Sequence, residues 1–100
     1  MATDIQLARA ASAAALATEG VHAMGRGRYV EAATYDGPEK VSGVVVGPDE
    51  VEVHVVVRWP LPKPIPEIAG GIIASVAPQA DGRKTTVIVD DLEVGADENL

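Results

Sequence analysis

The sequence contains no cysteine and no phenylalanine, and aromatic residues make up only 3% of its 100 residues. Without cysteine the chain has no disulfide framework, no thiol nucleophile and no zinc site with sulfur ligands. With so few aromatic side chains, the core has to be built from valine, isoleucine, leucine and alanine. Such a core packs thin layers well but is poorly suited to enclosing a large pocket, which argues against an enzyme that acts on a small molecule.

Long apolar runs are also missing. No run approaches the roughly 20 residues that are needed to span a bilayer. The N-terminus does not show a charged start followed by an apolar run and a cleavage site. We therefore expect an intracellular, soluble protein that does not insert into a membrane by itself.

Basic residues are scarce, and the net charge is −7. The excess of acid lies in two segments: residues 36–60 carry five acidic and two basic residues, and residues 81–100 carry six acidic and two basic residues. Phosphate backbones and anionic lipids are bound mainly by lysine and arginine. The charge therefore argues against non-specific binding to nucleic acid and against direct adsorption to a lipid surface.

The most informative pattern is an alternating run that ends at Trp59. A strand has a side-chain period of two, so alternation predicts one buried face and one wetter face. The buried set is Val51, Val53, Val55, Val57 and Trp59, and the wetter set is Glu52, His54, Val56 and Arg58.

The remaining pattern predicts helices and strands in a simple order. Alanine dominates the first segment, which Thr3 or Asp4 can cap and Gly20 can end. The expected elements are a helix over 4–19, a short strand over 28–35, strands over 41–46 and 51–59, a helix over 65–77 and a strand over 84–94. The acidic tail over 95–100 is expected to fray.

This order predicts one domain over residues 1–100 with an α+β fold. The helix over 65–77 can link the strands before and after it as a right-handed crossover, which makes those strands parallel. We expect a small two-layer domain in which two helices pack on one face of a three- or four-stranded mixed sheet. The glycines Gly70 and Gly71 inside the second helix suggest a close contact with the first helix or with the sheet.

The candidate chemistry is sparse. Glu52 could orient His54 as a base, but neighbours on a strand face meet by geometry alone, and no serine or cysteine nucleophile is linked to them. The acidic sets Asp90, Asp91, Glu93 and Asp49, Glu50, Glu52 lack the regular ligand array of a calcium loop. We therefore expect no catalytic residue, no metal site and no cofactor.

A glycine-rich basic loop gives an alternative function. The run Gly25-Arg26-Gly27-Arg28 could hold a phosphate with its two arginines, although it lacks the spacing and the lysine of a P-loop. The alternative prediction is a small ligand- or RNA-binding module that contacts an anion through Arg26 and Arg28. If the run has no binding role, it is a flexible connector after the first helix.

Apolar residues on the wetter side of the sheet indicate a contact surface. Helices on one side cannot cover Val44, Val56, Ile88 and Leu92 if these residues point to the other side. A contiguous uncovered apolar patch marks an interaction site, whereas single exposed valines need no explanation.

The order of these segments resembles a known family. An alanine-rich helix ends in Glu19-Gly20-Val21, and the strands Gly43-Val44-Val45-Val46 and Val51-Glu52-Val53-His54-Val55-Val56-Val57 follow. Ile65-Pro66-Glu67-Ile68-Ala69 opens a helix, and Thr86-Val87-Ile88-Val89-Asp90-Asp91-Leu92 is the last strand. This arrangement, from about residue 7 to 94, resembles the alkaline-shock-protein family of envelope stress response proteins, also called the Gls type. The chain departs from the family pattern at Gly25–Arg28 and at the link Trp59–Pro64.

The resemblance implies a non-enzymatic, cytoplasmic bacterial protein of cell-envelope homeostasis. It implies self-assembly into a homo-oligomer, and recruitment to the inner face of the cell membrane by a membrane-anchored protein partner. It carries no catalytic residue over to this chain. Together with the two-sided apolar strands, it suggests an adaptor or scaffold whose contact residues are Val44, His54, Val56, Arg58 and Ile88.

Overall fold

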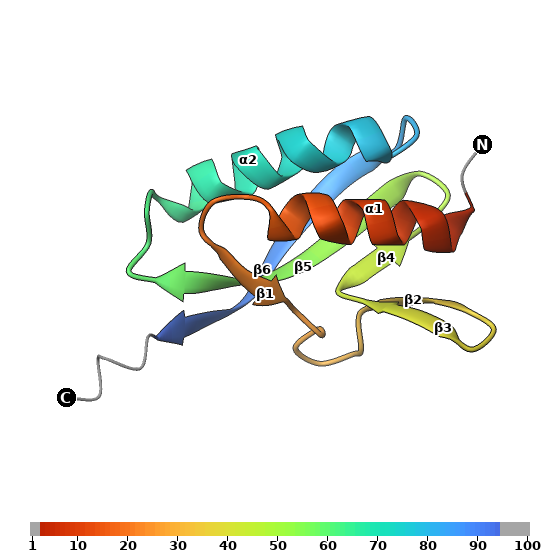
Figure 1. Ribbon diagram of the computed structural model, residues 1–100, viewed down its shortest axis with the longest axis horizontal. Helices are drawn as coiled ribbons and strands as arrows, with labels where there is room; N and C mark the ends of the chain where they lie inside the picture. Colours follow the sequence, from red (N-terminus) through yellow and green to blue (C-terminus); the bar gives the residue numbers. More distant parts are fainter. Residues whose placement is uncertain (1–2, 95–100) are drawn as a thin grey trace.

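The computed structural model describes residues 3–94 and shows a small α+β domain with a four-stranded mixed sheet and a separate two-stranded sheet (Figure 1). Both helices lie against the same face of the larger sheet, as predicted. The elements in chain order are α1 (Asp4–Leu16), β1 (Val21–Met24), β2 (Ala33–Asp36), β3 (Glu39–Ser42), β4 (Val44–Val46), β5 (Glu50–Trp59), α2 (Ile65–Val76), the short 3₁₀ helix η1 (Ala77–Gln79) and β6 (Lys84–Val94).

Strand β5 is the centre of the larger sheet. Strands β1 and β4 pair antiparallel with different stretches of β5, and β6 pairs with it in parallel along its full length. Helix α2 makes the crossover between β5 and β6, which confirms the predicted parallel pair. The valines at 51, 53, 55 and 57 are fully buried beneath the helices, or nearly so, which confirms the alternating pattern. Trp59, at the end of the strand, stays partly exposed.

Helix α1 begins at a capping box. The Thr3 side chain accepts from the Gln6 N–H, and the Gln6 side chain accepts from the Thr3 N–H. The helix ends at Leu16 and not at Glu19, because the chain turns through Gly20 at a φ of +94°. Val21 then starts β1, a strand that the sequence pattern did not predict.

Helix α2 packs with Ile68, Ile72 and Val76 into the core. A Cβ on Gly71 would lie 3.3 Å from the Thr18 Cγ2, whereas a Cβ on Gly70 would meet nothing within 4 Å. The predicted close approach therefore involves Gly71 and the turn after α1, and Gly70 takes no part in it.

The strand predicted over 41–46 is in fact two strands that belong to different sheets. Gly43 separates them with a φ of +87°, a conformation that side chains other than glycine disfavour. Strand β3 pairs with β2 in the small sheet, while β4 pairs with β5. The strand predicted over 28–35 begins only at Ala33, and the chain before it forms a loop.

Candidate functional site

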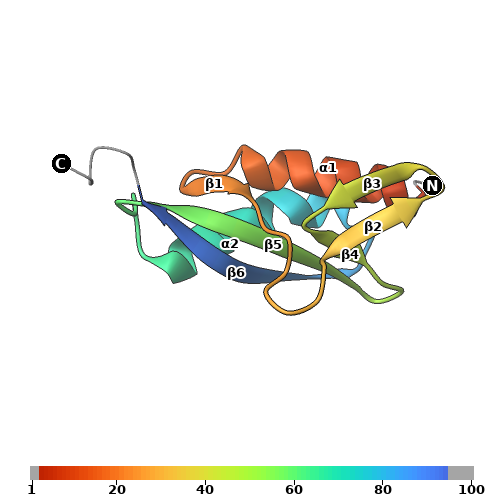
Figure 2. The same ribbon diagram turned by 90° about the horizontal axis from the view of Figure 1, so that it is seen from below.

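The loop before β2 lies across the face of the larger sheet that the helices do not cover, which we call the open face. Figure 2 shows this loop, residues 25–32, passing across β5. Its course is fixed by backbone hydrogen bonds: the Gly25 N–H donates to the His54 carbonyl over 2.7 Å, and the Ala32 N–H donates to the Arg26 carbonyl over 2.8 Å. The loop is therefore held against β5 at a defined place.

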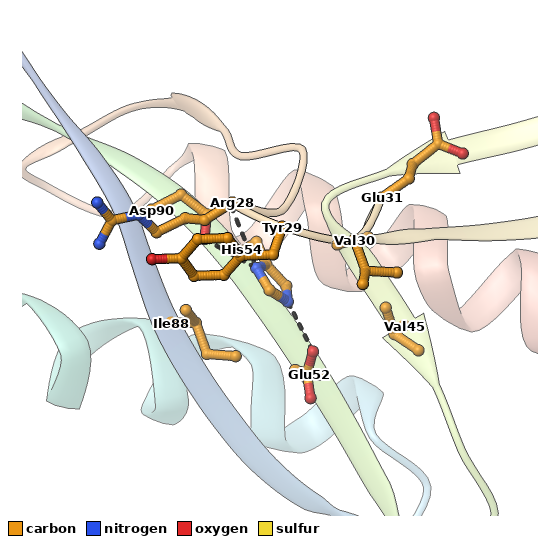
Figure 3. A pocket seen from close by; sticks show the side chains of 10 residues that line it. Arg28, Tyr29, Val30, Glu31, Val45, Glu52, His54, Ile88 and Asp90 are labelled. Atoms are coloured by element: carbon orange, nitrogen blue, oxygen red, sulfur yellow. Dashed lines mark hydrogen bonds and ion pairs between the residues drawn. The ribbon is translucent and has the colours of Figure 1, made fainter.

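Loop and sheet together enclose a concavity of about 480 Å³. Its apolar walls are Tyr29 and Val30 from the loop, Val45 from β4 and Ile88 from β6. Figure 3 shows Val45 and Ile88 on opposite sides of His54, as the strand order β4–β5–β6 requires. The polar side chains that line it are Arg28, Glu31, Glu52, His54 and Asp90.

His54 lies between two carboxylates at the base of the concavity. Its Nδ1 is 3.0 Å from the Asp90 Oδ1, and its Nε2 is 2.6 Å from the Glu52 Oε1 (Figure 3). The side chains of His54 and Asp90 are 9% and 7% exposed, whereas that of Glu52 is 35% exposed. We call these three residues the His54 cluster.

The register of β5 and β6 creates this cluster. His54 is opposite Ile88, and the pairing then shifts so that Val55 opposes Val89 while Val56 opposes Asp91. Asp90 is the extra residue of this bulge, and such a bulge re-aims a side chain. The Asp90 carboxylate thereby reaches His54 and also accepts the Gly27 N–H at 2.8 Å.

The pKa of His54 is raised above its ordinary value of 6.5. Burial alone lowers this pKa, because it disfavours the charged imidazolium. The hydrogen bonds and the negative charges of Asp90 and Glu52 outweigh that effect. When protonated, the ring donates to both carboxylates and forms an ion-paired link between β5 and β6, which the Gly27 N–H joins to the loop.

In this geometry neither ring nitrogen of His54 is free for another partner. A general base needs a nitrogen within reach of the proton that it abstracts, and both ring nitrogens already face carboxylates. No serine or threonine lines the concavity in the part of the chain that the structure describes. The two carboxylates lie at opposite ends of the ring, and among residues 3–94 no group of histidines and acids converges on a metal position.

The basic loop is occupied by the protein's own carboxylate. Arg26 and Arg28 line a second depression together with Asp90 and Asp91. The Gly27 N–H, which could serve an external anion, donates to Asp90 instead. A phosphate placed here would meet two carboxylates, which disfavours the anion site that the sequence suggested.

The structure disperses the five expected contact residues. His54 and Ile88 line the concavity, and Val56 lies in the neighbouring depression beside Asp91. Arg58 lies beside the Thr18–Val21 turn and the prolines after β5. Val44 is fully buried on the helix side of the sheet and cannot contact a partner, because the break at Gly43 changes which side of the sheet Val44 faces.

Sequence reasoning missed Tyr29, Val30 and Asp90 as site residues. Tyr29 and Val30 were assigned to a strand, but they lie in the loop and are 93% and 80% exposed. In the sequence, Asp90 belongs to an acidic set that lacks the ligand array of a calcium loop. The sequence offered one weak signal for the contact between Asp90 and His54, because the spacing along each strand allows both side chains to point to the same face. Without the register of the two strands, this signal does not show that the two residues meet.

Comparison of the chain with protein-family models, with curated proteins and with solved structures found no match in any of the three. The resemblance to the alkaline-shock-protein family therefore stays a prediction. Among the described residues, no helix combines the length and the apolar character needed to cross a membrane.

Proposed function

We propose that this protein is a non-enzymatic adaptor of the bacterial envelope stress response that docks on a membrane-anchored protein through the open face of its sheet. The observation that carries the proposal is the pair Tyr29 and Val30, which are 93% and 80% exposed at the rim of an apolar concavity. Tyrosine is enriched at protein interfaces, and binding energy concentrates in a few such side chains set around a pocket.

The His54 cluster supports docking more than catalysis. It holds the loop that carries Tyr29 and Val30 through the Gly27 N–H and the Gly25 N–H, both of which bond to members of the cluster. A rigid loop loses less conformational freedom on binding than a mobile one, so more of the contact energy appears as affinity. The cluster thus prepares the docking surface without taking part in a reaction.

The test is copurification from the native host. A tagged wild-type protein and a Tyr29→Ser/Val30→Ser variant are expressed in that host, membranes are isolated gently, and the bound proteins are identified by mass spectrometry. We expect one membrane protein in near-equal amount with the wild type and its loss with the variant. A matched Leu16→Ser/Ile73→Ser variant removes exposed apolar side chains from the two helices and should retain the partner.

Other results would redirect the proposal. Recovery of a second copy alone in equal amount would replace the membrane-anchored partner with self-assembly. Recovery of RNA that dissociates steeply as salt rises would favour the ligand-binding module at Arg26 and Arg28. A partner that the Tyr29→Ser/Val30→Ser variant retains would contradict docking through the open face.

A further inference from the structure

The concavity adjoins an acidic depression at the start of β5. This second depression has a volume of about 280 Å³ and shares Val45 and Glu52 with the concavity. Its other charged residues are Asp49 and Glu50, so three carboxylates and no basic side chain line it. The two depressions adjoin at Val45 and Glu52, and we call them together the β4–β5 groove.

The charge of this groove changes along its length. At one end Arg28 lines the concavity, and Figure 3 shows its side chain running toward β6 and away from Val45. At the other end lie Asp49, Glu50 and Glu52. Because His54 is already paired with Glu52 and Asp90, it supplies no further positive charge to this acidic end.

The neighbouring basic side chains do not cancel the acidic end. Lys84 is opposite Glu50 in the β5–β6 register, but it makes no ion pair within residues 3–94. The Arg83 Nε donates to the Gly47 carbonyl at 2.9 Å, and its outer nitrogens lie 3.8 Å from Asp4 and 3.9 Å from Asp81. Glu52 is itself paired with His54, so the carboxylates of Asp49 and Glu50 stand against one nearby ammonium group.

We propose that the β4–β5 groove binds a polypeptide segment of the partner that carries an apolar side chain next to lysine or arginine residues. This inference rests on the proposed docking function and names the chemistry of its partner. The apolar side chain fills the concavity between Val30, Val45 and Ile88, and the basic residues lie against Asp49, Glu50 and Glu52.

A phage-displayed library of random 12-residue peptides, panned on the intact protein, tests this partner chemistry. We expect the selected peptides to share an apolar residue beside at least two basic residues. The most enriched peptide is then synthesised with a fluorescein label, and its affinity is measured by fluorescence polarisation.

Matched variants place the binding site. Asp49→Asn/Glu50→Gln should weaken the peptide roughly tenfold at low salt and much less at high salt, because exposed charge pairs are modest and are screened. Glu19→Gln/Glu67→Gln removes the same charge near the ends of α1 and α2 and should leave the affinity unchanged. Circular dichroism verifies that each variant is folded.

Three results would overturn this inference: selected peptides without basic residues, equal affinity for the two charge variants, or no enriched peptide. If the Tyr29→Ser/Val30→Ser variant still loses its partner in the native host, docking through the open face stands. Only the inferred apolar and basic composition of the bound segment is then wrong. If that variant also keeps its partner, the proposed docking function fails together with the inference.

Discussion

The two faces of the larger sheet are built from different chemistry although they share the same strands. On the helix face, β5 contributes only aliphatic side chains, and these pack with α1 and α2 into one apolar core. On the open face, the same strand contributes Glu50, Glu52, His54, Val56 and Arg58, and a loop takes the place of a helix. The helix face holds the apolar core, whereas the open face carries the groups on which the proposed docking depends.

One part of the open face, the His54 cluster, is also expected to stabilise the fold. Asp90 is buried and bonds both to His54 and to the loop, whereas Glu52 is partly exposed. Asp90→Ala should lower the free energy of unfolding by about 3–5 kcal/mol, because it removes the buried carboxylate partner of His54 and leaves the Gly27 N–H without its acceptor. Glu52→Ala should cost less than about 1 kcal/mol, since an exposed ion pair contributes little.

Urea unfolding followed by circular dichroism measures both variants of that pair. If Glu52→Ala lowers the free energy of unfolding as much as Asp90→Ala does, the burial of a carboxylate does not determine how much it stabilises the protein.

Replacing one isoleucine by alanine on each face should give the next largest difference in the free energy of unfolding. Ile72→Ala opens a cavity in the fully buried core and should lower the free energy of unfolding by about 2–5 kcal/mol. Ile88→Ala lies in the concavity of the open face and should cost less than about 1.5 kcal/mol. Equal losses in thermal or urea unfolding would show that the open face also belongs to the core.

The pH dependence of stability distinguishes the His54 cluster from the aliphatic core. The pKa of His54 is raised in the folded protein, so its contribution to stability is fully present below the unfolded pKa of about 6.5. It is lost as the pH rises through the higher folded pKa. The free energy of unfolding should therefore fall across this window in the wild type, while His54→Gln should not show that fall. NMR titration of the His54 ring would contradict this prediction if it gave a pKa below 6.5.

The smallest effect on stability is expected at the rim of the concavity. Tyr29→Ser and Val30→Ser should each change the free energy of unfolding by less than about 0.5 kcal/mol, because both side chains are exposed. Both substitutions should nevertheless remove the partner. A large loss of stability in either variant would mean that the loop is part of the core and would undermine its use as a docking element.

Much of the fold could be predicted from local patterns. The alternating valines of β5 and the helical spacing of Ile68, Ile72 and Val76 identify their elements directly, because each pattern reports which side is buried. Strand β6 has the predicted bounds, and the parallel pair follows from the helix between β5 and β6.

The candidate site could not be predicted in the same way. It depends on the positive φ of Gly43, on the turn that starts β1 and on the bulge at Asp90. The Gly43 break and the Asp90 bulge involve hydrogen bonds to other segments, since Gly43 bonds to Ala32 and His54, and Asp90 accepts the Gly27 N–H. The segment over 41–46 reads as a single valine-rich strand across Gly43, so it concealed the change of sheet that buries Val44.

Photo-crosslinking in the native host tests the difference between the two faces most directly. A photoreactive phenylalanine derivative is placed at Tyr29 on the open face or at Leu16 on the helix side, both of which are exposed. The account predicts a crosslink to one discrete protein from position 29 and none from position 16. Crosslinking from position 16 alone, or from neither position, would contradict the account.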